Sequence, residues 1–273
     1  MNICSRRALL QLACSVLPFE GMNLMRPLGV NAADHPAAPL PVGDLFPTQP
    51  PELVREMVTV AHFDLKRVQE LVGARPSLAR AAWDWGFGDW ETALGGASHM
   101  GNRPIAEYLI AQGARPTLFS ATMLGQLEVV KAFVAAQPGV QRIRGPHSVT
   151  LLAHAKAGGE TARDVYQFLQ RLGDADEDPP PTISESDISS IVGTYSFGVA
   201  ASQQVDVTFE QGKLTWARKG MMGRWLVHLG DRTFYPIGAP AVRIRFAEDN
   251  GAVEMTIHDP DLVLTARRRK PAK

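Results

Sequence analysis

Cysteine, net charge and long apolar runs are all scarce in this sequence of 273 residues. Cys4 and Cys14 are the only thiols, so the chain beyond residue 14 offers no disulfide, thiolate nucleophile or cysteine metal ligand. Lys and Arg total 28, as do Asp and Glu, which excludes a global field that would attract nucleic acid or an anionic membrane. No apolar run reaches about 18 residues, so we expect no membrane span.

Motifs that carry catalysis are also missing. The chain contains neither S-x-x-K nor G-x-S-x-G, and Glu91 stands where a dinucleotide loop beginning at residue 86 needs its third glycine. No H-x-x-x-H or H-E-x-x-H set occurs among the seven histidines, and we expect His99 and His154 to be ordinary packing or surface residues. The sequence therefore predicts a protein that is not an enzyme, with no catalytic residue, no metal ligand and no cofactor.

The N-terminal segment has the order of features found in an export signal. Residues 5–11, SRRALLQ, resemble the twin-arginine export motif, and a modest apolar run follows from Ala8 to Leu17. Small residues at 30–32, VNA, supply a cleavage site. We therefore predict a signal over residues 1–32, a periplasmic protein, and an extended Pro- and Ala-rich leader over 33–51. If the segment is not a signal, the protein is cytoplasmic.

A short helix-ending segment recurs along the chain. GARPSL at 73–78 returns as GARPTL at 113–118, and each copy follows an amphipathic stretch, LKRVQELV at 65–72 or IAEYLIAQ at 105–112. Apolar residues at i, i+3 and i+4 predict helices, while Gly followed by Pro predicts their ends. Repeated helix pairs are expected over residues 52–173.

A second recurring pattern identifies the kind of repeat. Positions spaced by +2, +5 and +9 occur three times: Thr92, Leu94, Ala97 and Gly101; Pro116, Leu118, Ala121 and Gly125; Thr150, Leu152, Ala155 and Gly159. Residues 89–101 match the motif D-x-x-T-P-L-H-x-A-x-x-x-G except that Ala93 and Gly95 replace Pro and His. The segment thus resembles the ankyrin-repeat family. The resemblance implies an irregular α-solenoid of helix pairs that binds a protein partner.

Four aromatic residues gather in the connection before the best-matched repeat: Trp83, Trp85, Phe87 and Trp90. In ankyrin arrays this connection projects toward the binding face, so exposed aromatics there are candidate anchors for a partner. The other interpretation is that they fold back and complete a small core. The sequence leaves both open.

The chain changes character after the helical repeats. Acidic residues and three prolines predict a stiff linker over residues 174–187, DADEDPPPTISESD. From 188 to 270, alternating apolar residues predict short antiparallel strands joined by turns at 211–212, 230–231 and 250–251. The fold class is therefore α+β in two domains, an α-solenoid followed by a small antiparallel β-sheet or barrel.

The β region resembles the small β domain appended to exported hydrolases of the serine β-lactamase type. The residues that carry the likeness are Gly193-Thr194-Tyr195, Gly212-Lys213-Leu214, Phe234, Ile244-Arg245-Phe246, Gly251-Ala252-Val253 and Arg267. Because the hydrolase motifs are missing from the chain, the resemblance implies an accessory fold and no hydrolase activity.

These observations predict a non-catalytic protein–protein interaction module of the bacterial cell envelope, which binds a protein partner through the helical array. No nucleic-acid partner is expected. The alternative is a small-molecule-binding accessory protein with a cavity in the β domain lined by Trp216, Trp225, Phe234 and Tyr235, although the same four residues are also suited to plain core packing.

Overall fold

The computed structural model describes residues 47–176, 180–218, 221–249, 252–260 and 262–269. These residues belong to one unit, Leu45–Lys273. The predicted export signal and residues 33–46 of the predicted leader lie outside the described residues, so the expected localisation stays a prediction. No helix in the described ranges is both long and apolar enough to cross a membrane.

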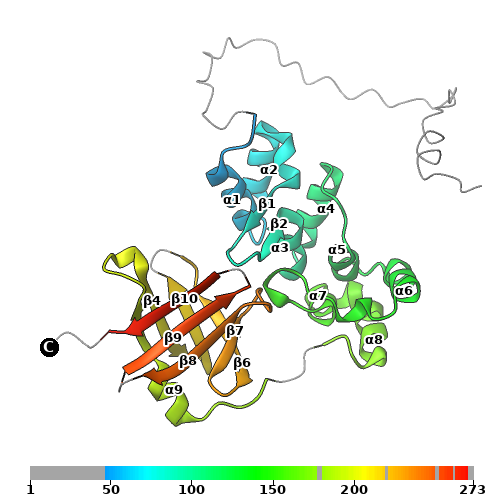
Figure 1. Cartoon of the computed structure of the whole chain (residues 1–273). Coiled ribbons are helices and arrows are strands. Elements are labelled where there is room, and N and C mark those ends of the chain that lie inside the picture. Colours follow the sequence, from blue (N-terminus) through cyan, green and yellow to red (C-terminus); the bar gives the residue numbers. More distant parts are fainter. Residues whose placement is uncertain (1–46, 177–179, 219–220, 250–251, 261, 270–273) are drawn as a thin grey trace, which may run out of the picture. The chain divides into compact units, whose positions relative to one another are not determined.

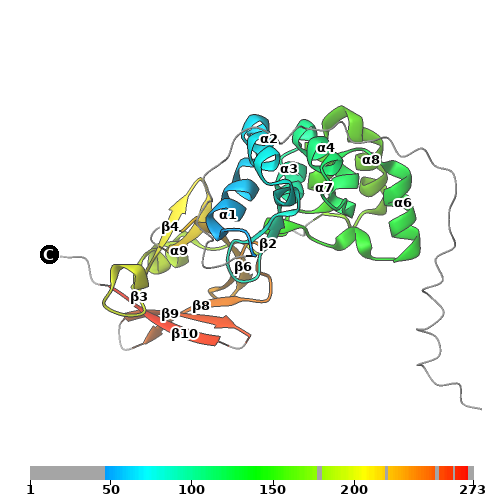
Figure 2. The same cartoon turned by 90° about the horizontal axis from the view of Figure 1, so that it is seen from above.

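The described chain begins with helices that follow one another in packed pairs (Figure 1, Figure 2). Within each pair the two helices contact each other, and α1, α3, α5 and α7 also pack in series. The helices are α1 Pro51–Val60, α2 Leu65–Ala74, α3 Ala93–His99, α4 Arg103–Ala111, α5 Leu118–Met123, α6 Leu127–Ala136, α7 Leu151–Ala157 and α8 Arg163–Leu172. Packed helix pairs are thus present where they were expected, while their identity as repeats of the ankyrin type stays a prediction.

Threonine side chains begin the first helix of three pairs. The hydroxyl oxygens of Thr92, Thr117 and Thr150 each accept a hydrogen bond from the backbone N–H three residues later. The sequence pattern placed Pro116 at this position in the third repeat, and the structure corrects that register by one residue. Proline cannot supply a side-chain acceptor, so the neighbouring Thr117 does so and forms a capping box with Ser120.

The repeated glycine is required by close backbone contact. Gly101 and Gly125 have φ of +70° and +76°, and a Cβ at either position would collide with a carbonyl oxygen, of Ala157 or Thr161. Glycine therefore lets the turns after α3 and α5 lie directly against the end of α7 and the segment that follows it.

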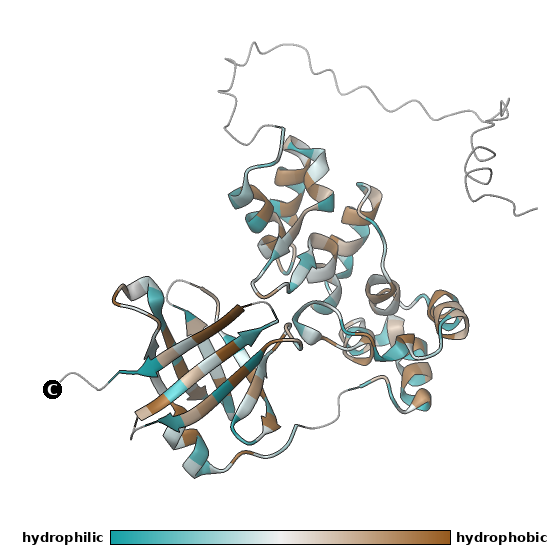
Figure 3. Cartoon of the chain, in the orientation of Figure 1, coloured by the Kyte–Doolittle hydropathy of each residue, from teal (hydrophilic) through white to brown (hydrophobic). Residues whose placement is uncertain are grey.

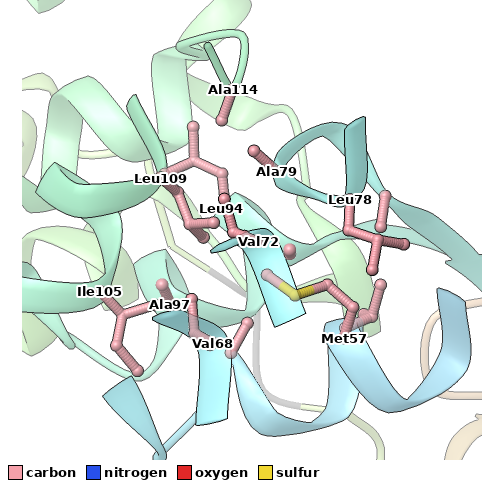
Figure 4. Packing of buried hydrophobic residues seen from close by; sticks show 14 of the residues in the cluster. Met57, Val68, Val72, Leu78, Ala79, Leu94, Ala97, Ile105, Leu109 and Ala114 are labelled. Atoms are coloured by element: carbon pink, nitrogen blue, oxygen red, sulfur yellow. The ribbon is translucent and has the colours of Figure 1, made fainter. Parts of the chain in front are cut away.

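Small and large apolar side chains alternate in the core of the first two pairs, shown in Figure 4. Leu94, Ile105 and Leu109 are almost fully buried there, and Ala97 gives α3 the room to pack closely against its neighbours.

A two-stranded hairpin, β1 Ala82–Asp84 and β2 Trp90–Thr92, connects the first pair to the second. It contains the tryptophan-rich segment.

The C-terminal part is a closed antiparallel barrel with strand order β10-β3-β4-β5-β6-β7-β8-β9. The strands are β3 Gly193–Ser196, β4 Gln204–Glu210, β5 Lys213–Arg218, β6 Arg224–Gly230, β7 Thr233–Pro236, β8 Arg243–Asp249, β9 Ala252–Asp259 and β10 Leu262–Arg268. The predicted antiparallel β region is confirmed, and it closes as a barrel. A short helix, α9 Glu185–Ile191, precedes it and begins inside the predicted linker, because Ser184 caps its first turn.

Alternation along each strand separates an apolar interior from a mixed exterior. Brown and teal residues alternate along β8 and β9 in Figure 3. Tyr195, Phe234, Phe246 and Met255 fill the interior, and the Phe246 ring contacts those of Tyr195 and Phe234, with centroids 5.5 and 5.7 Å apart. The barrel interior is therefore a packed core.

Candidate metal centre

Glu91 on β2 is the centre of an unusual polar cluster. Successive side chains of a strand point to opposite sides, so Trp90 is exposed while the neighbouring Glu91 is only 1% exposed. A carboxylate at such depth loses its hydration and needs strong compensating partners. Three histidines provide them.

The three histidines come from segments far apart in the sequence. His62 follows the end of α1, His99 is the last residue of α3, and His147 lies in the loop before α7. The Nε2 atom of His99 is 2.9 Å from Glu91 Oε1, whereas the Nε2 atoms of His62 and His147 are each 3.4 Å from Glu91 Oε2. One ligand atom from each of the four residues lies within 4.8 Å of all the others.

These separations suit a shared metal ion. Zinc–nitrogen bonds of about 2.0–2.1 Å and a tetrahedral arrangement place neighbouring ligand atoms roughly 3.3 Å apart. The distances to Glu91 bracket that value, and the Nε2 atoms of His62 and His99 are 3.1 Å apart. Either a hydrogen bond between these two ring nitrogens or a cation that both of them bind accounts for so short a separation.

Outer hydrogen bonds orient these side chains. His62 Nδ1 lies 2.9 Å from the Val58 carbonyl oxygen, which only accepts, so the ring proton is on Nδ1 and the Nε2 lone pair faces the cluster. His147 Nδ1 is 2.8 Å from Asp89 Oδ2, and Trp85 Nε1 donates to Glu91 Oε2 at 2.8 Å. Carboxylate and carbonyl partners of this kind hold metal-binding histidines in place.

The backbone at His147 is held in a costly conformation. His147 and Ser148 have φ of 57° and 59°, in the left-handed region that non-glycine residues seldom adopt. Asp89 Oδ1 accepts from His147 N at 2.9 Å, and Ser148 Oγ accepts from Gly238 N at 2.9 Å, which fixes both residues. Strained residues that are held this firmly cluster at functional sites.

The charges of the clustered side chains compensate one another. Burial raises the pKa of Glu91, but hydrogen bonds from His147 and His99 outweigh it and lower that pKa to about 2. Burial lowers the pKa of His147, but hydrogen bonds to Asp89 and Glu91 raise it to about 9. The pKa of His62 is lowered, chiefly by burial. The cluster thus holds ionised carboxylates and a positive charge on His147, and a metal ion that binds there would replace the proton of that ring.

Asp89 extends the cluster to the barrel. It is 2% exposed, and besides His147 it accepts a hydrogen bond from Arg224 Nη1, 3.0 Å from Oδ2. Arg224 opens β6, is 6% exposed, and also donates to the Ile237 carbonyl oxygen at 2.7 Å. The buried ion pair between Asp89 and Arg224 therefore joins the hairpin to the barrel, and Asp89 in turn holds His147 in place beside Glu91.

His154 lies behind the four clustered residues. Its ring centroid is 6.5 Å from that of His99, and its Nδ1 lies 2.8 Å from the Thr150 carbonyl oxygen. Burial lowers the pKa of His154 to about 4, so this fully buried ring is neutral. It packs behind His99 without belonging to the set of possible ligands.

The structure separates the four aromatic residues predicted to contact a partner. Trp83 and Trp85 pack against the helical core, and Trp85 also bonds to Glu91. Phe87 contacts Trp216 of the barrel, with ring centroids 5.6 Å apart. Trp90 alone of the four is largely exposed, at 64%.

The four residues predicted to line a β-domain cavity are also divided between two environments. Trp216 and Phe234 are buried in the barrel core. Trp225 and Tyr235 face outward and line a groove of about 800 Å³ on the outer wall. The four side chains therefore do not share one cavity.

Sequence reasoning missed His62, Glu91, His99 and His147 as a group and assigned no metal ligand. These four residues are separated by 29, 8 and 48 positions in the sequence, and such spacings match no local metal-binding motif. One signal was available: His62 comes shortly after α1 and His99 is the last residue of α3, and these two helices pack against each other.

Comparisons with known proteins return no match to a family model, a curated protein or a solved structure. The geometry of the site therefore carries the functional argument.

Proposed function

We propose that this protein binds a divalent first-row transition metal ion, with Zn²⁺ the principal candidate, through His62, Glu91, His99 and His147. The observation that carries the proposal is the convergence of three imidazole nitrogens and one buried carboxylate within 4.8 Å. Outer hydrogen bonds already hold two of those imidazoles and the carboxylate in orientations suited to coordination.

The chemistry of the ligands selects the class of ion. Three imidazole nitrogens and one carboxylate oxygen suit Zn²⁺ and its neighbours Co²⁺, Ni²⁺ and Cu²⁺. Ca²⁺ and Mg²⁺ prefer sets of oxygen ligands, and Cu⁺ prefers sulfur. Neither preference is met by this cluster.

The number and burial of the ligands favour a structural role for the ion. Four protein ligands complete a tetrahedral zinc site, whereas catalytic zinc keeps a position open for water or substrate. The side chains of the four residues are between 0% and 21% exposed. An ion at this position ties together the end of α1, the hairpin, α3 and the loop before α7, and so stabilises the folded chain.

The direct test is metal titration of chelator-stripped full-length protein. We expect one Zn²⁺ per chain, an increased melting temperature, and tetrahedral Co²⁺ absorption that Zn²⁺ displaces. Glu91→Gln and His99→Ala should lose these responses, whereas His258→Ala, an exposed barrel histidine, should retain them. Equal metal binding by wild type and both cluster variants would refute the proposal.

A protein partner is a second candidate function, and the exposure of Trp90 favours it. Large aromatics that lie free on a hairpin are suited to anchoring an interface. The proposed partner belongs to the cell envelope, as the N-terminal motif suggests. Trp90→Ala should reduce capture of that partner and leave the melting temperature unchanged. Because Trp85 bonds to Glu91, Trp85→Ala serves as the contrasting variant that impairs the metal site.

A further inference from the structure

The outer wall of the barrel carries an apolar surface formed by β6 and β7. On β6, Leu226 is part of the barrel core, whereas Trp225, Val227 and Leu229 line a groove on the outside. Val227 pairs with Tyr235 on β7, which places their side chains on the same outer face. Trp225 and Leu229 are 46% and 43% exposed.

The segment before α9 forms the second side of a groove over this wall. Residues 180–183 line it opposite the strands, and the Pro181 carbonyl oxygen lies 3.0 Å from His228 Nδ1. Ile183 packs against the barrel core and anchors the segment. The groove encloses about 800 Å³, within the range of about 300–1,000 Å³ typical of small-molecule sites.

The charged lining of the groove has one sign. It includes Lys213 and Arg144 but no Asp or Glu. Lys213 Nζ lies 3.4 Å from the centroid of the Trp225 ring, and it forms no ion pair with any described residue. A cation at the edge of an apolar surface is complementary to an anionic head group attached to an apolar body.

We propose that this groove binds a small amphiphilic carboxylate of the fatty-acid type. Its apolar chain lies along Trp225, Val227 and Leu229, and its carboxylate pairs with Lys213. The strand from Trp225 to Leu229 advances about 13 Å, which gives an extended chain room to lie flat. This binding activity is independent of the metal centre, since the groove and the four clustered residues share no side chain.

Calorimetric titration of the metal-loaded full chain tests the proposal, with octanoate, decanoate and decanol as probes below their aggregation limits. Decanoate should bind in a single site and more tightly than octanoate, because each buried methylene contributes roughly fourfold in affinity. Decanol should bind at least tenfold more weakly than decanoate, because it lacks the charge that Lys213 recognises.

Variants locate the site. Lys213→Met keeps the apolar stem of the side chain. It should reduce the affinity for decanoate at least tenfold without changing the affinity for decanol. Lys131→Met, at an exposed lysine of α6, is the matched control and should change neither the decanoate affinity nor the decanol affinity. Val227→Glu should abolish decanoate binding, and Lys213→Met keeps the test valid if Val227→Glu does not fold.

Three results would overturn the inference. The first is no binding of decanoate, and the second is an equal loss of decanoate and decanol affinity in Lys213→Met. The third is binding of a proline-rich peptide in the groove by a protein that does not bind carboxylates. Glu91→Gln should bind decanoate normally. That variant separates failure of this inference from failure of the proposed metal site.

Discussion

The helical part and the barrel bury different kinds of side chain. Barrel strands enclose aromatic and aliphatic residues, and Arg224, at the start of β6, is the one charged residue buried among the described residues of those strands. The helical part and its hairpin bury Asp89, Glu91 and His154. Apolar burial stabilises a fold without needing specific partners, whereas buried charge must be paired. The buried charged groups are therefore the more informative ones, and Asp89 and Glu91 both lie at the candidate metal site.

The largest expected effect comes from removing apolar volume from the barrel. Phe234 is fully buried, so Phe234→Ala should reduce the free energy of unfolding by about 3–5 kcal/mol. Because Phe234 is not near the clustered ligands, the variant's remaining folded population should keep wild-type Zn²⁺ affinity. Denaturant unfolding and metal titration measure the two quantities. A large loss of metal affinity would show that the two regions are not independent.

Removing the buried carboxylate should abolish metal-dependent stability. With Zn²⁺ at about 100 times the dissociation constant, wild type should gain about 2.7 kcal/mol in the free energy of unfolding. Glu91→Gln keeps the size of the side chain but not its charge, and should gain almost nothing. Unfolding curves with and without Zn²⁺ give the difference, and a gain of wild-type size in the variant would contradict the assignment of Glu91.

Asp89 should matter through His147 and not through direct coordination. Asp89→Asn removes the charge that faces His147 Nδ1, so Zn²⁺ affinity should fall about 10–100-fold while tetrahedral Co²⁺ spectra persist. The matched control is Asp84→Asn in the same hairpin, whose carboxylate accepts from Gly86 N. Its affinity should stay within about twofold of wild type. A lost tetrahedral spectrum in Asp89→Asn would mean that Asp89 is itself a ligand.

The smallest effect concerns Tyr195, whose ionisable ring is buried in the barrel core. Burial raises the pKa of Tyr195 to about 12, above the value of about 10 in an unfolded chain. The neutral phenol is therefore favoured in the fold, and its contribution to stability is complete below pH 10 and is lost as pH rises from about 10 to about 12. Tyr195→Phe should lose about 1 kcal/mol at neutral pH, from the hydrogen bond to the Ile191 carbonyl oxygen, and should show a flatter alkaline profile. Unfolding curves at successive pH values measure both.

Local features of the sequence were enough to predict most of the architecture. Thr92 and Thr150 mark helix starts, Gly101 and Gly125 mark turns, and alternation after residue 188 marks strands. Each of these signals depends on neighbours a few residues away. The error at Pro116 had the same origin, because the spacing pattern took no account of which side chain can accept a hydrogen bond.

The candidate site could not be predicted in the same way. The alternation along Trp90, Glu91 and Thr92 is enough to predict that Glu91 is buried. It does not predict that the Glu91 carboxylate faces His62 and His147. The predictions for the aromatic residues show the same division: the segment rich in tryptophan was recognised, but its aromatic residues lie in three different environments.

The sequence by itself determined the order of helices and strands, because capping, turns and periodicity are local interactions. Tertiary structure alone decided that residues 62, 91, 99 and 147 share one site, and that Trp225 and Tyr235 face outward while Trp216 and Phe234 face inward. These outcomes depend on how helices pack in series and how strands close into a barrel. Such contacts join residues distant in the chain, and no local pattern specifies them.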